Sequence, residues 1–352
     1  MKTKMLLAGL LFLQGLTAQK VDLDRFSFSV AYRDLPRQPI DSGYHTYAFQ
    51  LQTGPLMRVA REQARGTETL YIEGWMGVVD GADIAVSLVM EDLVVTKSAI
   101  AEREEVKKDK EGKIISARRF YAPVLTYYYA ARMELRDRQG RTLQSRQLVT
   151  RNQSFQYTGP EKSSRAEVSG LMMNSFDLTG PLSYSVVTKT IRDLSVDLTN
   201  SYGYAERRIS DQVWVLDSRQ HPEYEAFRQH WGNVKNGLIL LQPDVPLDDV
   251  KRSIASDITY FESLPDKYSG RSKADRKLRY AAYYMLAKIH YYLDNPGLSA
   301  TAATSLVLND YDSRDGKYLE AAALELMEIF RINKRHSRHF PLYFDGMAAT
   351  NQ

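Results

Sequence analysis

The 352-residue sequence contains no cysteine, which excludes disulfide bonds, thiol nucleophiles and thiolate metal sites. The same absence excludes a lipoprotein, because the lipid of such a protein is attached to a cysteine at the signal-cleavage site. The sequence also lacks the phosphate-binding, dinucleotide-binding, zinc-protease and nucleophile-elbow motifs. We therefore expect no cofactor and no metal site, and we predict a protein that is not an enzyme.

A strong imbalance of charge is missing as well. The chain has 47 basic and 43 acidic residues, a formal net charge of +4, and its basic residues are interleaved with acidic ones. A nucleic-acid-binding protein typically gathers its basic residues on one face, so this pattern predicts no nucleic-acid partner.

Candidate catalytic groups are equally sparse. Among six histidines only His336 and His339 are close in sequence, and neighbouring basic residues such as Lys334 and Arg338 would repel a cation. We therefore expect residues 336–352 to form a flexible, solvated tail. Acidic residues are abundant but no pair stands out, so a hydrolase with carboxylates that the sequence does not reveal remains one alternative.

The N-terminus has the three-part pattern of a secretory signal. Lys2 and Lys4 precede a short apolar stretch, Met5–Leu16, and the small residue Ala18 offers a cleavage point. The stretch is too short for a good membrane-spanning helix, and no later segment is apolar enough to span a membrane. We predict a signal peptide over residues 1–18 and an exported protein, in the periplasm or associated with the outer membrane.

Residues 19–220 are expected to form a β-rich α+β domain with an antiparallel sheet and packed helices. Apolar and polar residues alternate from Phe26 to Val30, and glycine-containing turns at Gly112 and Gly140 favour hairpins. The charged run Glu102–Glu111 lies between two strand-like stretches, which predicts a projecting hairpin arm. The pattern favours a solvated hairpin tip over a specific contact site there.

Tyrosine is abundant, with 23 residues, and some lie in strand-like segments. Tyr127 and Tyr129 could form an aromatic platform on the sheet, which makes a glycan-binding protein a second alternative. Tyrosine is also a favoured strand residue that buries its ring, so structural packing competes with this interpretation. Further along the chain, Gly180 and Pro181 are expected to break a helix that begins near Ser164.

Residues 221–335 are expected to form an all-α domain of helical hairpins. Apolar residues recur at helical spacing, and short turns containing proline, glycine or aspartate separate the segments. Leu286, Ala287, the turn Asn295–Pro296, Ala300 and Ala303 give this part a pattern that resembles tetratricopeptide repeats. The resemblance implies a partner-binding groove, with the candidate partner-binding residues Tyr283, Tyr284 and Tyr291.

The order of the parts, a β-rich region before short helical repeats behind a signal peptide, resembles exported proteins of Bacteroidota envelopes. The leading hypothesis is therefore a non-enzymatic envelope protein that binds a protein partner or serves as an assembly or scaffold subunit. It would act in the periplasm or at the outer membrane, without spanning the membrane after signal cleavage.

Overall fold

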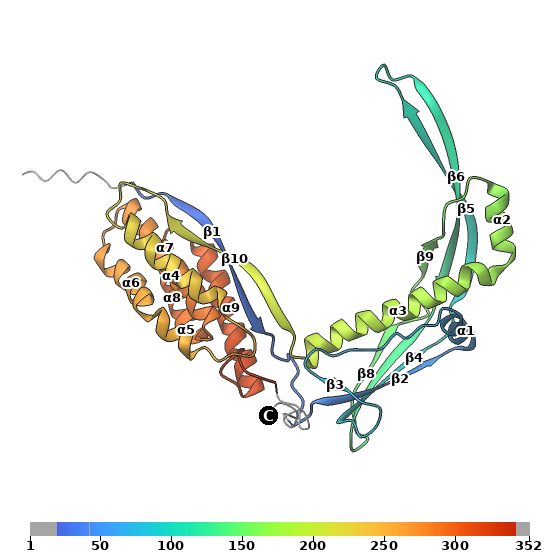
Figure 1. Ribbon diagram of the computed structural model, residues 1–352, viewed down its shortest axis with the longest axis horizontal. Helices are drawn as coiled ribbons and strands as arrows, with labels where there is room; N and C mark the ends of the chain where they lie inside the picture. Colours follow the sequence, from blue (N-terminus) through green and yellow to red (C-terminus); the bar gives the residue numbers. More distant parts are fainter. Residues whose placement is uncertain (1–19, 42, 343–352) are drawn as a thin grey trace, which may run out of the picture. The chain divides into compact units, whose positions relative to one another are not determined.

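The computed structural model describes residues 20–41 and 43–342. The fold is α+β, as the sequence predicts, with mostly antiparallel strands and with helices concentrated in the C-terminal half (Figure 1). The chain forms two compact units, and each is described by itself. Unit 1 comprises residues 20–35 and 206–342, and unit 2 comprises residues 36–41 and 43–205.

Two sequence predictions concern the N-terminus and membrane-spanning segments. The predicted signal peptide, residues 1–18, lies outside the described residues. In the described part of the chain, no helix is long and apolar enough to cross a membrane.

Unit 1 is built on a ribbon of two antiparallel strands, β1 (Leu23–Arg33) and β10 (Glu206–Leu216), which pair over their whole length. Side chains alternate across the ribbon, so Phe28, Val30 and Val215 share the face that is buried against helices. The ribbon joins the first described residues to a segment almost 200 residues later, and its apolar face forms part of the helical core.

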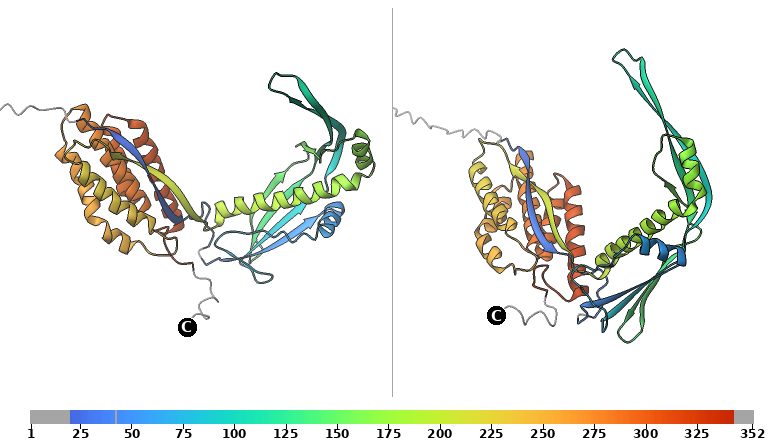
Figure 2. Two further views of the ribbon diagram at one scale, coloured as in Figure 1. Left: turned by 45° about the horizontal axis from the view of Figure 1, so that its top comes forward. Right: turned by 45° about the vertical axis from the view of Figure 1, so that its right-hand side comes forward.

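The helices of unit 1 follow β10 in the chain and lie beside the ribbon (Figures 1 and 2). In order, they are α4 (Tyr224–Ile239), α5 (Asp248–Ser253), α6 (Ala255–Lys267), α7 (Lys273–Tyr292), α8 (Pro296–Leu308) and α9 (Ser313–Asn333). α8 packs on both α7 and α9. A Cβ at Gly316 would lie 2.9 Å from the Ala303 carbonyl oxygen, so the close approach of α8 and α9 depends on glycine at this position.

Unit 2 contains two sheets. One has the strand order β3-β2-β4-β7-β8 and the other β5-β6-β9. Their bounds are β2 (Thr46–Thr53), β3 (Met76–Gly77), β4 (Ile84–Met90), β5 (Val94–Lys108), β6 (Ile114–Tyr128), β7 (Ala131–Asp137), β8 (Thr142–Val149) and β9 (Phe155–Thr158). The pairs of β2 with β3 and β4 are parallel and the others antiparallel.

Three helices accompany these sheets in the described residues of unit 2: α1 (Pro55–Gln63), α2 (Arg165–Met173) and α3 (Ser175–Tyr202). The predicted helix break at Gly180–Pro181 is wrong, because α3 continues through both residues. Leu182, Val187 and Ile191 of α3 are buried in the core that the helix shares with the sheets. This burial holds the helix together across the backbone hydrogen bond that Pro181 cannot donate.

The predicted projecting hairpin is confirmed. β5 and β6 pair antiparallel around a turn in which Gly112 has a φ of +84°, and the Asp109 side chain accepts hydrogen bonds from the Glu111 and Lys113 backbone N–H groups. β9 pairs only with the inner part of β6, so the outer part of the hairpin extends as a two-stranded arm (Figure 1).

The division of the chain differs from the predicted boundary at residue 220. Residues 20–35 and 206–220 belong with the C-terminal helices, so that unit is not all-α. The alternation of Phe28 and Val30 shows that the segment is a strand, but it does not say what the apolar face covers. Here it covers α4 and α7, which contribute Trp231 and Tyr292 to contacts with Phe28.

Candidate functional site

Two adjoining cavities of about 370 and 290 Å³ lie along β10 in unit 1. They share Ser210 and Asp211, and together they are lined by the unbroken run Ile209–Trp214. A continuous stretch of one strand therefore forms a wall of both cavities, which makes them parts of one elongated depression.

The opposite wall is one face of α9. Asp315, Tyr318, Leu319 and Ala322 line the cavities, and their i, i+3, i+4, i+7 spacing places them on one side of the helix. α7 packs on both β10 and α9 and provides the floor. The floor residues are Tyr284, Lys288, Tyr291 and Tyr292. We refer to this depression as the β10–α9 groove.

The groove follows the unpaired edge of β10. Side chains of both faces of the strand line it, for example Asp211 from the helix-facing side and Gln212 from the exposed side. The Gln212 backbone N–H donates to the Asp211 Oδ1 at 2.8 Å, so it does not point to β1. Because inward and outward residues alternate in an antiparallel pair, Ser210, Gln212 and Trp214 direct their backbone groups away from β1.

The middle of the groove is held by a charged cluster. Asp211 Oδ2 accepts a hydrogen bond from Lys288 Nζ at 2.6 Å and another from the Tyr292 hydroxyl. Burial alone would raise the pKa of Asp211, but the hydrogen bond and charge of Lys288, with the Tyr292 hydroxyl, lower it below its ordinary value. Burial and the adjacent Asp211 charge raise the pKa of Tyr292. The cluster is therefore a stable ion pair with a neutral phenol at pH 7.

A second polar group lies toward the other end of the groove. Tyr280 of α7 donates to Asp315 Oδ2 at 2.5 Å, which fixes α9 against α7. Across from it the Arg25 guanidinium lies over the Trp214 ring, 4.6 Å from its centroid. Arg25 has no ion-pair partner among residues 20–41 and 43–342, so its charge is available at the groove wall.

One end of the groove is bounded by the segment Ser337–Phe340, here called the C-terminal strap. The Arg338 guanidinium lies over the rings of Tyr32 and Tyr291, both of which line the groove, at 4.4 and 4.8 Å from their centroids. The Arg33 N–H donates to the Arg338 carbonyl at 3.1 Å, which links the strap to the end of β1.

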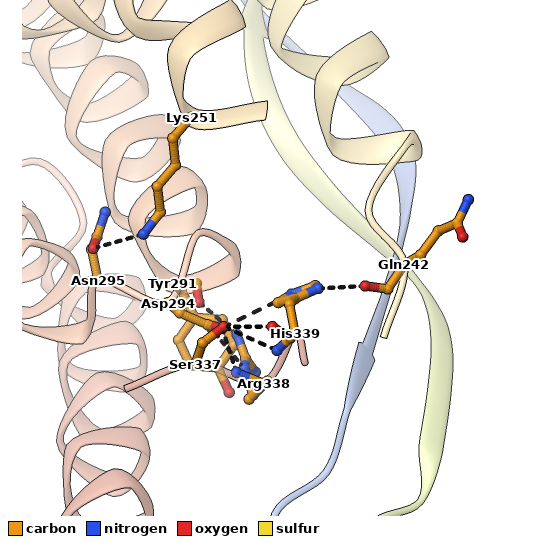
Figure 3. Close-up of polar contacts among 8 residues, drawn as sticks. All are labelled: Gln242, Lys251, Tyr291, Asp294, Asn295, Ser337, Arg338 and His339. Carbon is orange, nitrogen blue, oxygen red and sulfur yellow. Dashed lines mark hydrogen bonds and ion pairs between the residues drawn. The ribbon is translucent and has the colours of Figure 1, made fainter. Parts of the chain in front are cut away.

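Figure 3 shows why the strap is held in place. Asp294, in the turn after α7, accepts hydrogen bonds from the Arg338 N–H at 2.6 Å, from its Nε at 2.7 Å and from the Ser337 hydroxyl at 2.8 Å. The Asp294 side chain is 0% exposed and that of Arg338 4%. His339 is buried beside them, and its Nδ1 lies 2.8 Å from the Gln242 carbonyl oxygen.

The prediction of a solvated tail is therefore wrong for residues 337–340. The basic residues were expected to stay in water, but the buried Asp294 carboxylate provides the counter-charge that Arg338 needs. Residues 343–352 of the predicted tail lie outside the described residues. Among residues 20–41 and 43–342, no group of three His, Asp or Glu side chains is arranged to hold a metal ion.

The candidate partner-binding tyrosines of α7 separate into two groups. Tyr284 and Tyr291 line the groove, with Lys288 Nζ 5.6 Å from the Tyr284 ring centroid and Arg338 over Tyr291. Tyr283 lies outside the groove and is partly buried, and burial raises its pKa. The structure thus brings two of these three residues to one surface.

The candidate tyrosines of unit 2 lie in its core. Tyr127 and Tyr129 are 8% and 7% exposed, and both pack on Phe155 with centroid distances of 5.6 and 5.4 Å. Their rings are covered, so neither forms a platform on the sheet surface.

Sequence reasoning missed the charged residues of the groove. Asp211 interrupts the apolar alternation of Ile209, Val213 and Val215, and a charge in a core-facing strand position indicates a buried partner. Lys288 interrupts the apolar face of α7 in the same way. These two charged positions in apolar patterns are the sequence features that could have indicated the groove. Nothing in the sequence shows that Asp211 and Lys288 bind one another.

Comparisons with known proteins assign no family to the chain. No protein-family model matches it, and no curated protein is significantly similar to it.

Proposed function

We propose that this chain is a protein-binding envelope protein that captures an extended peptide segment of its partner in the β10–α9 groove. The peptide adds a strand to the free edge of β10, and its side chains on one side face α7 and α9. This is the recognition mode in which main-chain hydrogen bonds supply affinity and flanking pockets supply specificity.

The observation that carries the proposal is the free strand edge beside a helix face. Ser210, Gln212 and Trp214 direct backbone groups outward into a depression whose other wall is α9. Exposed strand edges are usually shortened, charged or covered, whereas residues 209–214 of β10 carry one charge, that of Asp211, which is paired with Lys288. An extended segment fits such a site because it can pair with the backbone groups of Ser210 and Trp214, while the Gln212 N–H already donates to Asp211.

The tetratricopeptide-like character of α7 and α8 is part of the same proposal. The β1–β10 ribbon lies on the face of α4 and α7, and the groove is the strip beside the ribbon. The glycan-binding alternative loses its proposed platform, since Tyr127 and Tyr129 are core residues. For the hydrolase alternative, the groove carboxylates Asp211 and Asp315 are already bound by Lys288 and by tyrosine hydroxyls.

The test is a selection of displayed random short peptides on the chain without residues 1–18. We expect selected sequences to alternate in polarity, because successive residues of an added strand face opposite sides. Ser210→Pro removes one outward N–H and obstructs the edge, and edge strands tolerate proline. This substitution is expected to weaken binding of a selected peptide at least about fivefold.

Ser210→Ala is the matched control, because it changes the side chain and keeps the N–H. It should bind the peptide within about threefold of the unchanged protein, and both variants should retain its thermal unfolding curve. Equal binding by Ser210→Pro and Ser210→Ala in folded protein would show that the peptide does not pair with β10.

Export is the second part of the proposal and is supported by the pattern Lys2–Ala18. The measurement is the N-terminal residue of the protein recovered from the cell envelope. We expect it to fall near Gln19, and an envelope protein that still begins at Met1 would refute cleavage.

A further inference from the structure

The β5–β6 arm of unit 2 is exposed on both faces in its outer part. Every residue of Ala101–Lys108 is exposed, and the facing residues of β6 from Ile114 to Arg119 are exposed or partly buried. At roughly 3.3 Å per residue, this length carries the tip on the order of 25 Å beyond the inner part of the hairpin. The base of this outer part is tied to the segment after β9 by an ion pair between Arg103 and Glu161 at 2.8 Å.

The tip, Val106–Ile115, combines two properties. Its apolar side chains are in water: Ile114 is 58% exposed, Ile115 68% and Val106 38%. The same ten residues contain four lysines against Asp109 and Glu111. In the described part of the chain the side chains of these lysines, Lys107, Lys108, Lys110 and Lys113, have no ion-pair or hydrogen-bond partner.

This pattern differs from that of the arm below it. Arg119 lies 3.5 Å from both Glu102 and Glu104, and the Arg103 guanidinium lies over the Phe120 ring at 4.9 Å. Charges along the arm therefore neutralise one another. At the tip, by contrast, an excess of positive charge lies next to exposed isoleucine side chains. Lysine alone would protect a strand edge from unwanted pairing, but exposed isoleucine has the opposite effect.

The composition of the tip favours a lipid surface over a protein surface. Lysine is depleted in protein interfaces, whereas four of the ten residues of this tip are lysines. Aliphatic side chains flanked by lysines are the combination that enters a lipid–water interface, where anionic headgroups attract each lysine.

We propose that the tip of the β5–β6 arm binds an anionic lipid surface, with Ile114 and Ile115 entering the interface and the four lysines contacting headgroup phosphates. The inference is independent of the peptide groove in unit 1. It describes attachment to a membrane surface and needs no membrane-spanning segment.

The test is co-sedimentation of the chain without residues 1–18 with vesicles at low salt. We expect binding to vesicles of phosphatidylcholine mixed with phosphatidylglycerol, weaker binding at high salt, and little binding to phosphatidylcholine alone. Lys107→Glu with Lys108→Glu should lower the partition coefficient at least about tenfold, since each lysine near the surface contributes about fivefold. Ile114→Ser with Ile115→Ser should also lower it, at unchanged charge.

Matched controls lie elsewhere on the same protein. Val79→Ser removes an apolar side chain that is 90% exposed, and Lys273→Glu reverses an exposed lysine of α7. Both should bind mixed vesicles like the unchanged protein. A tryptophan at the tip, Ile115→Trp, should show a blue-shifted emission on mixed vesicles, which reports entry into the interface.

Three results would overturn the inference. They are absence of binding to mixed vesicles, equal binding by tip variants and controls, and loss of an envelope protein partner by tip variants whose vesicle binding is unchanged. Retention of the thermal unfolding curve by the variants keeps each result interpretable, because the tip makes no core contacts that folding needs.

Discussion

The molecule contains two long antiparallel ribbons of opposite character. The β1–β10 ribbon buries one face against α4 and α7, and Val215 is 0% exposed. The outer β5–β6 arm buries neither face, and the side chains of Ile114 and Ile115 at its tip are exposed. A two-stranded ribbon is marginally stable by itself, so the first is stabilised by its helices and the second extends from a sheet that anchors its base.

This difference in burial determines which parts of each ribbon remain accessible to a ligand. The covered ribbon has one face on the helices, and the edge of β10 forms one wall of the groove. The uncovered arm offers the side chains of its tip. Secondary structure is the same in both ribbons, and the difference in burial is the basis for proposing peptide as the ligand of the β10 edge and lipid as the ligand of the arm's tip.

The largest expected effect is at matched phenylalanines of the two ribbons. Phe28 of β1 is 3% exposed and meets Trp231 and Tyr292 edge-on at 5.5 and 5.6 Å. Phe28→Ala should lower the free energy of unfolding by about 3–5 kcal/mol, because it leaves a cavity in the core. Phe120→Ala in the arm should cost less than about 1 kcal/mol. Urea titration of both variants measures the contrast, and similar losses would contradict it.

The strap that joins β1 to α7 gives the next effect. Asp294→Ala leaves the buried Arg338 charge without its partner and should destabilise unit 1 by about 3–5 kcal/mol. The control is Asp217→Ala, which removes an exposed partner of Arg228 and should change stability by less than about 1 kcal/mol. Calorimetric unfolding of both variants distinguishes them, and a stable Asp294→Ala protein would show that the strap is not needed.

Acid should lower the free energy of unfolding of unit 1, which contains the β1–β10 ribbon. His290 of α7 is buried with an unpaired Nδ1, and burial, together with Lys251, lowers its pKa from 6.5 to about 4. The unfolded chain therefore binds one proton more between these values, so stability falls as pH falls from about 6.5 to 4, by roughly 3 kcal/mol at the lower end. His290→Leu should flatten this dependence. Stability measured against pH for both proteins checks it, and parallel curves would exclude His290 as the cause.

The smallest effect is expected at the ion pairs of the arm. Arg119→Ala removes contacts with Glu102 and Glu104, all of which are exposed. Surface pairs contribute little, so the change in the free energy of unfolding should stay below about 0.5 kcal/mol. A loss above about 2 kcal/mol in urea titration would show that the arm depends on these pairs as the other ribbon depends on its core.

Local patterns in the sequence predicted the elements better than their partners. The turns at Gly112 and Gly140, the projecting arm and the C-terminal helices follow from spacing within short windows, and the structure confirms them. The pairing of β1 with β10 joins distant segments, and alternation carries no information about which distant face an apolar side covers. The helix break predicted at Pro181 is wrong for a similar reason: it depends on distant contacts. The burial of α3 on the sheets outweighs the one backbone hydrogen bond that Pro181 cannot donate.

The candidate site was predicted in part. The resemblance to tetratricopeptide repeats implies a partner-binding groove with Tyr283, Tyr284 and Tyr291, and two of these, Tyr284 and Tyr291, line the groove beside β10. The strand wall was not foreseen, because it required knowing that β10 lies on α7. The tail was misjudged because the counter-charge of Arg338 is Asp294, more than 40 residues earlier.

The most direct test of peptide capture is residue-resolved amide hydrogen exchange of the chain without residues 1–18, with and without a selected peptide. The N–H groups of Ser210 and Trp214 point away from β1, so they should exchange fast in the free protein and slowly in the complex. The intervening Asp211 and Val213 should be protected in both states. Unchanged exchange at Ser210 and Trp214 in a saturated complex would contradict strand addition at β10.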